Sequence, residues 1–114
     1  MTFPRRGEIY WVRLDPTLGT EIAKTRPAVV ISNDVGNRHA EHLIVAPLTS
    51  RGTDRVYPFE VLVPPGESGV DRASKVALDQ IRTVSKKRLG ARIGALDGER
   101  LEQVNAAIRL SLDV

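Results

Sequence analysis

The hydrophobic residues fall into short runs separated by turn-forming residues. Runs that are rich in β-branched and aromatic residues are typical of strands. Five segments meet this description: residues 7–14, 28–32, 42–48, 56–63 and 74–84, of which the last is long enough for one or two strands. Glycine, proline and polar residues dominate the connections, which we interpret as loops or turn-rich segments over residues 15–25, 33–42, 51–55 and 64–71.

The end of the chain has a different period. Apolar residues recur there every three or four positions, which indicates an amphipathic helix carrying Leu101, Val104, Ala107, Ile108 and Leu112. Asp97 is placed to cap its N-terminus, and Leu96 could pack on Leu101 as a hydrophobic staple. Five or so strands followed by one helix predict a small α+β fold, a curled antiparallel sheet or open barrel.

Length and composition are those of one globular domain. The 114 residues suit a single domain over residues 1–114, with 41% hydrophobic and 27% charged side chains. The chain has no cysteine, which excludes disulfides, thiolate nucleophiles and zinc sites with thiolate ligands. Uncharged runs such as residues 27–33 are far shorter than the roughly 20 residues that span a bilayer, so we expect no membrane segment.

Positive charge is concentrated in residues 1–96, which carry 15 basic and 10 acidic side chains, whereas residues 97–114 carry 2 and 4. The net charge is +3, and 13 of the 17 basic residues are arginine. Arginine suits bidentate contacts with phosphate better than lysine does. Charge alone therefore leaves two interpretations open, a surface that binds a polyanion and an ordinary solvated surface.

Several kinds of active site are absent from the sequence. There is no glycine-rich phosphate loop, dinucleotide fingerprint or Gly-x-Ser-x-Gly motif. The only histidines, His39 and His42, flank Glu41 at a spacing that resembles a weak metal pair, but a second pair of ligands is missing. We favour a solvated loop here, and expect no metal and no cofactor.

Two short segments carry the remaining candidate chemistry. Arg26 precedes Pro27, and the residue before a proline is held extended. This would fix an arginine at the start of a buried strand, where it could bind a phosphate or lie on the surface. Thr49 and Ser50 end another strand beside the basic residue Arg51. Hydroxyls at such positions bind ligands or simply cap turns.

At these segments the sequence resembles the MazF/PemK family of toxin endoribonucleases. The resemblance extends over nearly the whole chain and rests on six segments in the family's order. They are residues 6–10 (RGEIY), 26–32 (RPAVVIS), 33–38 (NDVGNR), 47–50 (PLTS), 57–61 (YPFEV) and 80–84 (QIRTV).

The resemblance implies a small SH3-like open β-barrel of about five to seven strands with a C-terminal amphipathic helix, working as a homodimer. It implies metal-independent, sequence-specific cleavage of single-stranded RNA, usually mRNA, in the bacterial cytoplasm, with inhibition of translation and growth. It also implies a cognate antitoxin whose acidic, partly disordered tail blocks the RNA groove.

Carried over residue by residue, the family's catalytic arginine falls on Arg26 and its catalytic threonine on Thr49. The family's loop glutamate falls on Glu21. In this sequence the loop reads GTEI over residues 19–22, with Ile22 in place of the glutamine common in the family. Because this loop helps to select the RNA sequence, the departure concerns base preference and not the chemistry.

The residues also fit this reaction on physical grounds. An RNase without a metal or a histidine pair can use the 2′-hydroxyl of its substrate as nucleophile, which gives a 2′,3′-cyclic phosphate and a 5′-hydroxyl. Arg26 offers a rigid fork of donors and Thr49 a hydroxyl, both suited to charge on the phosphorane. Glu21 is a more ordinary general base than an arginine, which stays protonated.

Further residues are expected to contact RNA backbone and bases. These are Gly19, Thr20, Lys24, Ser50, Arg51, Arg55, Gln80 and Arg82. For the five with long charged or amide side chains, a plain surface role fits equally well.

Two other functions stay open. The same barrel serves gyrase poisons of the CcdB type. Against this function, the C-terminus lacks an aromatic tip, and the arginine and threonine of the nuclease family are both present as Arg26 and Thr49. The other is a catalytically silent RNA-binding barrel. Against it, the chain has few aromatic residues for base stacking, and we expect most of them in core strands: Phe3, Tyr10, Trp11, Tyr57 and Phe59.

Overall fold

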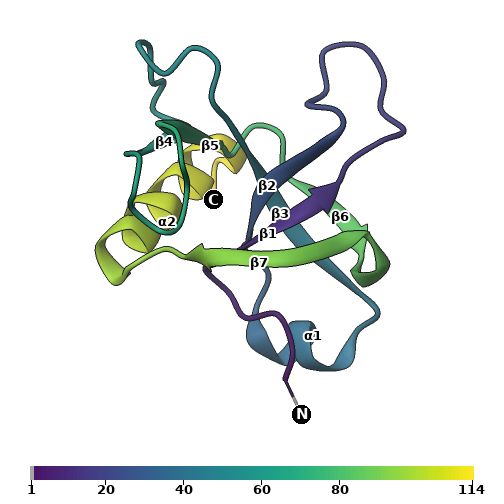
Figure 1. Cartoon of the computed structure of the whole chain (residues 1–114). Helices are drawn as coiled ribbons and strands as arrows, with labels where there is room; N and C mark the ends of the chain where they lie inside the picture. The colour runs from purple at the N-terminus through teal and green to yellow at the C-terminus, as the bar shows by residue number, and fades with distance from the viewer. Residues whose placement is uncertain (1) are drawn as a thin grey trace.

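The structure is a computed structural model that describes residues 2–114. Figure 1 shows a curled sheet with one long helix packed against it. The elements are β1 (Glu8–Arg13), β2 (Thr25–Val30), α1 (Asp34–His39), β3 (His42–Thr49), β4 (Glu60–Val63), β5 (Ser74–Ala77), β6 (Arg82–Ser85), a 3₁₀ turn (Lys86–Arg88), β7 (Leu89–Ala95) and α2 (Gly98–Leu112).

Within residues 2–114, seven strands form one antiparallel sheet. Six of them follow the order β4-β5-β3-β2-β1-β7, and the seventh, β6, pairs with β3. The long strand β3 connects the two parts of the sheet. One edge of β3 pairs with β2, while the other edge pairs with β6 along its first half and with β5 at its end. The sheet is open, since no pairing joins β4 to β7 in the described part of the chain. The predicted open antiparallel sheet with a C-terminal helix is confirmed.

Side chains that alternate along the strands feed two hydrophobic clusters on the two faces of the sheet. Val29 belongs to one cluster, and its neighbours Ala28 and Val30 belong to the other. The helix α2 covers the first cluster, where Val104 packs with Val61 and other residues of β4. Burial of each such valine or leucine stabilises the fold by about 1.5–3 kcal/mol. Both faces of β2 and β3 are therefore fixed by packing.

The predicted cap of α2 is confirmed: the carboxylate of Asp97 accepts a hydrogen bond from Arg100 N at 2.8 Å. Leu96 is buried, and Leu101 packs against the same cluster. Leu112 is different. Its side chain is 56% exposed, although its neighbour Ser111 donates to Leu78 O at 2.7 Å.

Three segments depart from the sequence prediction. The turn-rich connection at residues 33–42 contains the helix α1, which Asn33 caps by accepting from Gly36 N at 2.7 Å. The strand predicted over residues 56–63 begins only at Glu60, because Glu60 N closes a turn on Tyr57 O at 2.8 Å. The strand β2 begins at Thr25 instead of residue 28.

The strand β7 is missing from the sequence prediction. Its two glycines, Gly90 and Gly94, lower its β-propensity. Gly94 is required for close approach: a Cβ added to it would lie only 2.1 Å from Ser68 O, in the loop that crosses this strand. Tertiary contact, and not local preference, decides this strand.

No helix among residues 2–114 combines the length and the apolar composition that crossing a bilayer requires.

Candidate active site

Arg26 and Thr49 lie on two neighbouring strands. Arg26 lies in β2, and Thr49 is the last residue of β3. The pairing of these strands runs from Val30 opposite Val45 to Ala28 opposite Pro47, and Arg26 and Thr49 each lie two residues beyond that last pair. The two residues predicted to contact the phosphate therefore follow the same end of the β2–β3 pairing.

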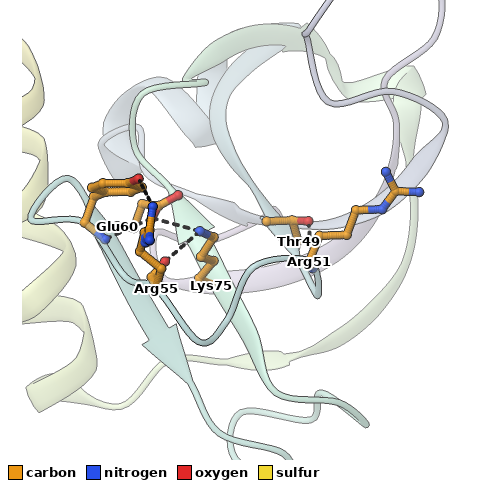
Figure 2. A network of polar contacts seen from close by, with 6 residues as sticks. Thr49, Arg51, Arg55, Glu60 and Lys75 are labelled. Atoms are coloured by element: carbon orange, nitrogen blue, oxygen red, sulfur yellow. Dashed lines mark hydrogen bonds and ion pairs between the residues drawn. The ribbon is translucent and has the colours of Figure 1, made fainter.

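Local hydrogen bonds orient both side chains. Arg26 is half-buried, and its Nε donates to Ala23 O at 3.2 Å, which directs the guanidinium fork and leaves its terminal amino groups for another acceptor. The Thr49 hydroxyl oxygen accepts from Arg51 N at 3.2 Å (Figure 2), so its own hydrogen can still be donated. The pair can therefore present several donors to one anion.

A polar pocket of about 280 Å³ lies beside β3. Pro47, two residues before Thr49 in β3, lines this pocket. The pocket walls also include Thr20, Glu21, Ile22, Asp79, Gln80, Ile81 and Arg82, but neither Arg26 nor Thr49. The carboxylate of Glu21 accepts from Leu18 N at 2.5 Å, in the turn of its own loop.

Gln80 and Arg82 bind the connection between β1 and β2, residues 14–24, which we call the β1–β2 loop. Gln80 Oε1 accepts from Ile22 N at 3.0 Å, and Gln80 Nε2 donates to Thr20 O at 3.4 Å. Arg82 Nη1 donates to Leu14 O at 2.8 Å. These two predicted RNA ligands thus use polar atoms to shape the loop that carries Glu21.

The glycine and the lysine of this loop adopt left-handed backbone conformations. Gly19 has φ of +56° and Lys24 has φ of +69°. A lysine seldom adopts this conformation, and here it places Lys24 O to accept from Leu14 N at 2.8 Å. Both residues are exposed at the surface, as the predicted RNA contacts require.

A second pocket, of about 250 Å³, is lined by Arg26, Ser50, Trp11 and Arg72 among others. Sequence reasoning missed Trp11 and Arg72. Trp11 is 45% exposed and Tyr57 is 44% exposed, and none of the five aromatic residues is fully buried. The prediction that most aromatic residues lie in the core was wrong: Trp11 lines this pocket at the surface, and Tyr57 lies in the connection before β4. The lack of stacking platforms is thus no argument against RNA binding.

The connection between β3 and β4, residues 50–59, is called the β3–β4 loop below. Arg51 and Arg55 are exposed on it, and Figure 2 shows the guanidinium of Arg51 directed away from the neighbouring polar network. Lys75 lies beneath the β3–β4 loop, and the sequence analysis did not identify it. A lysine within a short β-rich segment gives no signal of burial, yet Lys75 is only 8% exposed.

The sequence analysis placed the two histidines in a solvated loop, but the structure places them in regular elements. His39 ends α1 and His42 begins β3, and both are exposed. Among residues 2–114, no group of three or more His, Asp or Glu residues is arranged to hold a metal ion.

Comparison with known proteins identifies the family. The family of PemK-like, MazF-like toxins of type II toxin–antitoxin systems matches residues 5–112. Endoribonuclease EndoA of Bacillus subtilis (strain 168) is 38% identical over 108 residues, which cover 95% of this chain and 93% of that protein.

Two solved structures are similar over almost their whole length. MazF of Deinococcus radiodurans has a TM-score of 0.85 at 27% identity, with 100% of both chains covered. An endoribonuclease from Mycobacterial species, in complex with its cognate antitoxin, has a TM-score of 0.81 at 25% identity, covering 97% of this chain and 96% of that one. The chain therefore belongs to the PemK-like, MazF-like toxin family of type II toxin–antitoxin systems.

Proposed function

We propose that this chain is an endoribonuclease toxin that cleaves single-stranded RNA, mRNA in particular, at a short sequence and without a metal ion. Relatives named as endoribonucleases support the reaction class. The observation that carries the proposal is that Arg26 and Thr49 follow the same end of the β2–β3 pairing, with a guanidinium and a hydroxyl available as donors.

The chemistry follows from these donors. The 2′-oxygen of the RNA attacks the adjacent phosphorus while the bond from phosphorus to the 5′-oxygen breaks. A base takes the 2′ proton and the 5′-oxygen gains one, which leaves a 2′,3′-cyclic phosphate and a 5′-hydroxyl. Negative charge builds on the nonbridging oxygens, where the Arg26 fork and the Thr49 hydroxyl donate hydrogen bonds. Single-stranded RNA is required, because a paired strand does not readily bring the 2′-oxygen into line.

Glu21 is the proposed proton acceptor. Its carboxylate holds Leu18 N, so it has to exchange that amide for the 2′-hydroxyl when substrate binds. The pocket that Glu21 lines also includes Pro47, two residues before Thr49 in β3, which supports the exchange. Lys24, Ser50, Arg51 and Arg55, on the two loops flanking the pair, are proposed to bind the RNA backbone, with Gly19 and Thr20 shaping base preference.

The proposed partners follow from the family. A related structure holds its cognate antitoxin, which supports an antitoxin for this chain, and we propose that an acidic disordered tail of that partner covers the basic loops. We further propose that the chain acts as a homodimer in the bacterial cytoplasm. These proposals rest on the relatives and on the net positive charge of residues 1–96.

The test is a cleavage assay on a long unstructured RNA in excess EDTA. The parent protein is expected to make discrete cuts with 2′,3′-cyclic ends. Arg26→Ala and Thr49→Ala should each slow cleavage by roughly 10²-fold or more, as loss of transition-state donors does. Arg38→Ala, which removes an exposed arginine on α1, is the matched control and should cut at the parent rate.

Two results would contradict the proposal. A folded Arg26→Ala or Thr49→Ala protein that cuts at the parent rate removes that residue from the reaction. A parent protein that leaves many RNA sequences intact but traps gyrase on DNA belongs to the CcdB type of toxin instead. A Glu21→Gln protein with unchanged rate would assign proton transfer elsewhere and leave the reaction class standing.

A further inference from the structure

Lys75 is a buried cation at the centre of the sheet face that carries Thr49. The side chain lies in β5 and is 10% exposed, which is rare for a lysine because an ammonium loses hydration on burial. Such a group is tolerated only where partners replace the lost water. The partners of Lys75 therefore indicate what the structure uses this charge for.

All of these partners belong to the β3–β4 loop or to the first residue after it (Figure 2). Lys75 Nζ donates to Glu60 Oε1 and to Arg55 O, each at 3.0 Å. It also lies 5.8 Å from the centroid of the Tyr57 ring. Glu60 Oε1 accepts from Tyr57 N at 3.0 Å as well, so the ion pair binds the loop backbone at two points.

The ammonium also lies directly below the start of this loop. Thr49 and Lys75 are opposite one another in the pairing of β3 with β5. Gly52, with φ of +65°, passes so close that a Cβ on it would lie 3.4 Å from Lys75 Nζ. Lys75 therefore lies beside Thr49, at the end of β3 where the β3–β4 loop begins.

We propose that Lys75 is a positioning residue: its ion pair with Glu60 holds the β3–β4 loop so that the Thr49 hydroxyl and the Arg51 and Arg55 side chains face the RNA. The link to Thr49 is direct, because the Thr49 hydroxyl is oriented by the backbone N–H of Arg51 in this loop. Lys75 itself does not touch the substrate. This inference rests on the proposed function in assigning Thr49 to the reaction.

The experiment compares two variants with the parent protein. Lys75→Met removes the charge but leaves Glu60 buried without its partner, which could unfold the protein. The double variant Lys75→Met/Glu60→Met removes both charges, and replacing a buried pair by apolar residues commonly preserves the fold. Arg100→Met is the matched control, because it breaks the ion pair of Arg100 with Glu67 on another loop.

Two readouts are needed. Brief trypsin digestion, with the cuts located by mass spectrometry, reports the order of the β3–β4 loop through cleavage after Arg51 or Arg55. RNA cleavage at saturating RNA reports the placement of Thr49. In the double variant we expect new cuts in the loop and a rate lower by about 10²-fold, the effect of a displacement near 1 Å. The Arg100→Met control should match the parent in both readouts.

Each contrary result is informative. A folded double variant with parent proteolysis overturns the inference, because the loop then needs no anchor at Lys75. New cuts with an unchanged cleavage rate overturn it too, since loop position would not matter for the reaction. If the parent protein does not cleave RNA, the proposed function fails, and the trypsin result still shows separately whether Lys75 anchors the loop.

Discussion

The two loops that flank Arg26 and Thr49 are held by different physical means. Figure 1 shows both at one end of the molecule, opposite α1. The β1–β2 loop is held by separate hydrogen bonds from side chains that are not fully buried: Gln80, Arg82, and Arg88, which donates to Asp15 O. The β3–β4 loop depends on one buried ion pair, Lys75 with Glu60.

This difference predicts how each loop responds to mutation. In a set of separate hydrogen bonds, each contributing about 0.5–1.5 kcal/mol, one substitution removes only a small part of the free energy that orders the loop. A buried ion pair is lost all at once, since removing either partner leaves an uncompensated charge away from water. The β1–β2 loop is the one expected to shape base preference, and gradual anchoring allows its sequence to vary. The β3–β4 loop orients Thr49, where small displacements reduce the rate most.

The largest effect is expected on stability. Glu60→Ala leaves the Lys75 ammonium buried without its carboxylate, so the free energy of unfolding should fall by about 3–5 kcal/mol. Glu67→Ala breaks the more exposed pair with Arg100 and should lower it by about 1 kcal/mol or less. Urea unfolding followed by circular dichroism measures both. Equal losses in the two variants would show that burial gives the Lys75–Glu60 pair no special importance for holding the β3–β4 loop.

A smaller effect is expected at the β1–β2 loop. Gln80→Ala removes the bonds to Ile22 N and Thr20 O and should lower the free energy of unfolding by about 1 kcal/mol. Trypsin should then cut faster after Lys24, with no new cut after Arg55. Gln80→Glu keeps the acceptor for Ile22 N and should retain most of the protection. Cuts appearing in both loops of Gln80→Ala would mean that the loops share one anchor.

The smallest effect concerns an anchor outside both loops. The backbone N–H of Arg6 donates to Asp34 at 2.7 Å and holds the pKa of that carboxyl below its usual value of 3.8, with a further contribution from Asn37. Because the folded state lowers this pKa, its contribution to stability is present above pH about 3.8 and is lost as the pH falls through the folded-state value.

Asp34→Asn should therefore make the free energy of unfolding decline less steeply below pH 4, and trypsin cutting of the two loops should stay at the parent level at neutral pH. Urea unfolding at several pH values tests the slope. An unchanged slope would show that the Arg6–Asp34 contact contributes nothing to acid sensitivity.

Particular residues show which structural features could be predicted from the sequence. The pattern over residues 101–112 predicted α2, and Asp97 predicted its cap, because helix period and capping are local properties. The strand β7 could not be predicted, since its glycines lower its β-propensity and Gly94 is required by Ser68, a neighbour far away in the sequence. Trp11 was expected in the core because the sequence does not say which side chains of β1 other elements cover.

The sequence by itself determined the first strands, the C-terminal helix, the family resemblance, and the candidacy of Arg26, Thr49 and Glu21, since these depend on residue type and spacing along the chain. Only the tertiary structure decided how the candidate residues are arranged. Arg26 and Thr49 follow the same end of the β2–β3 pairing, while Glu21 lines a pocket that neither of them lines. The burial of Lys75 was likewise decided by folding, because the partners that make a buried charge tolerable lie 15 and 20 residues away along the chain and come together only when the sheet forms.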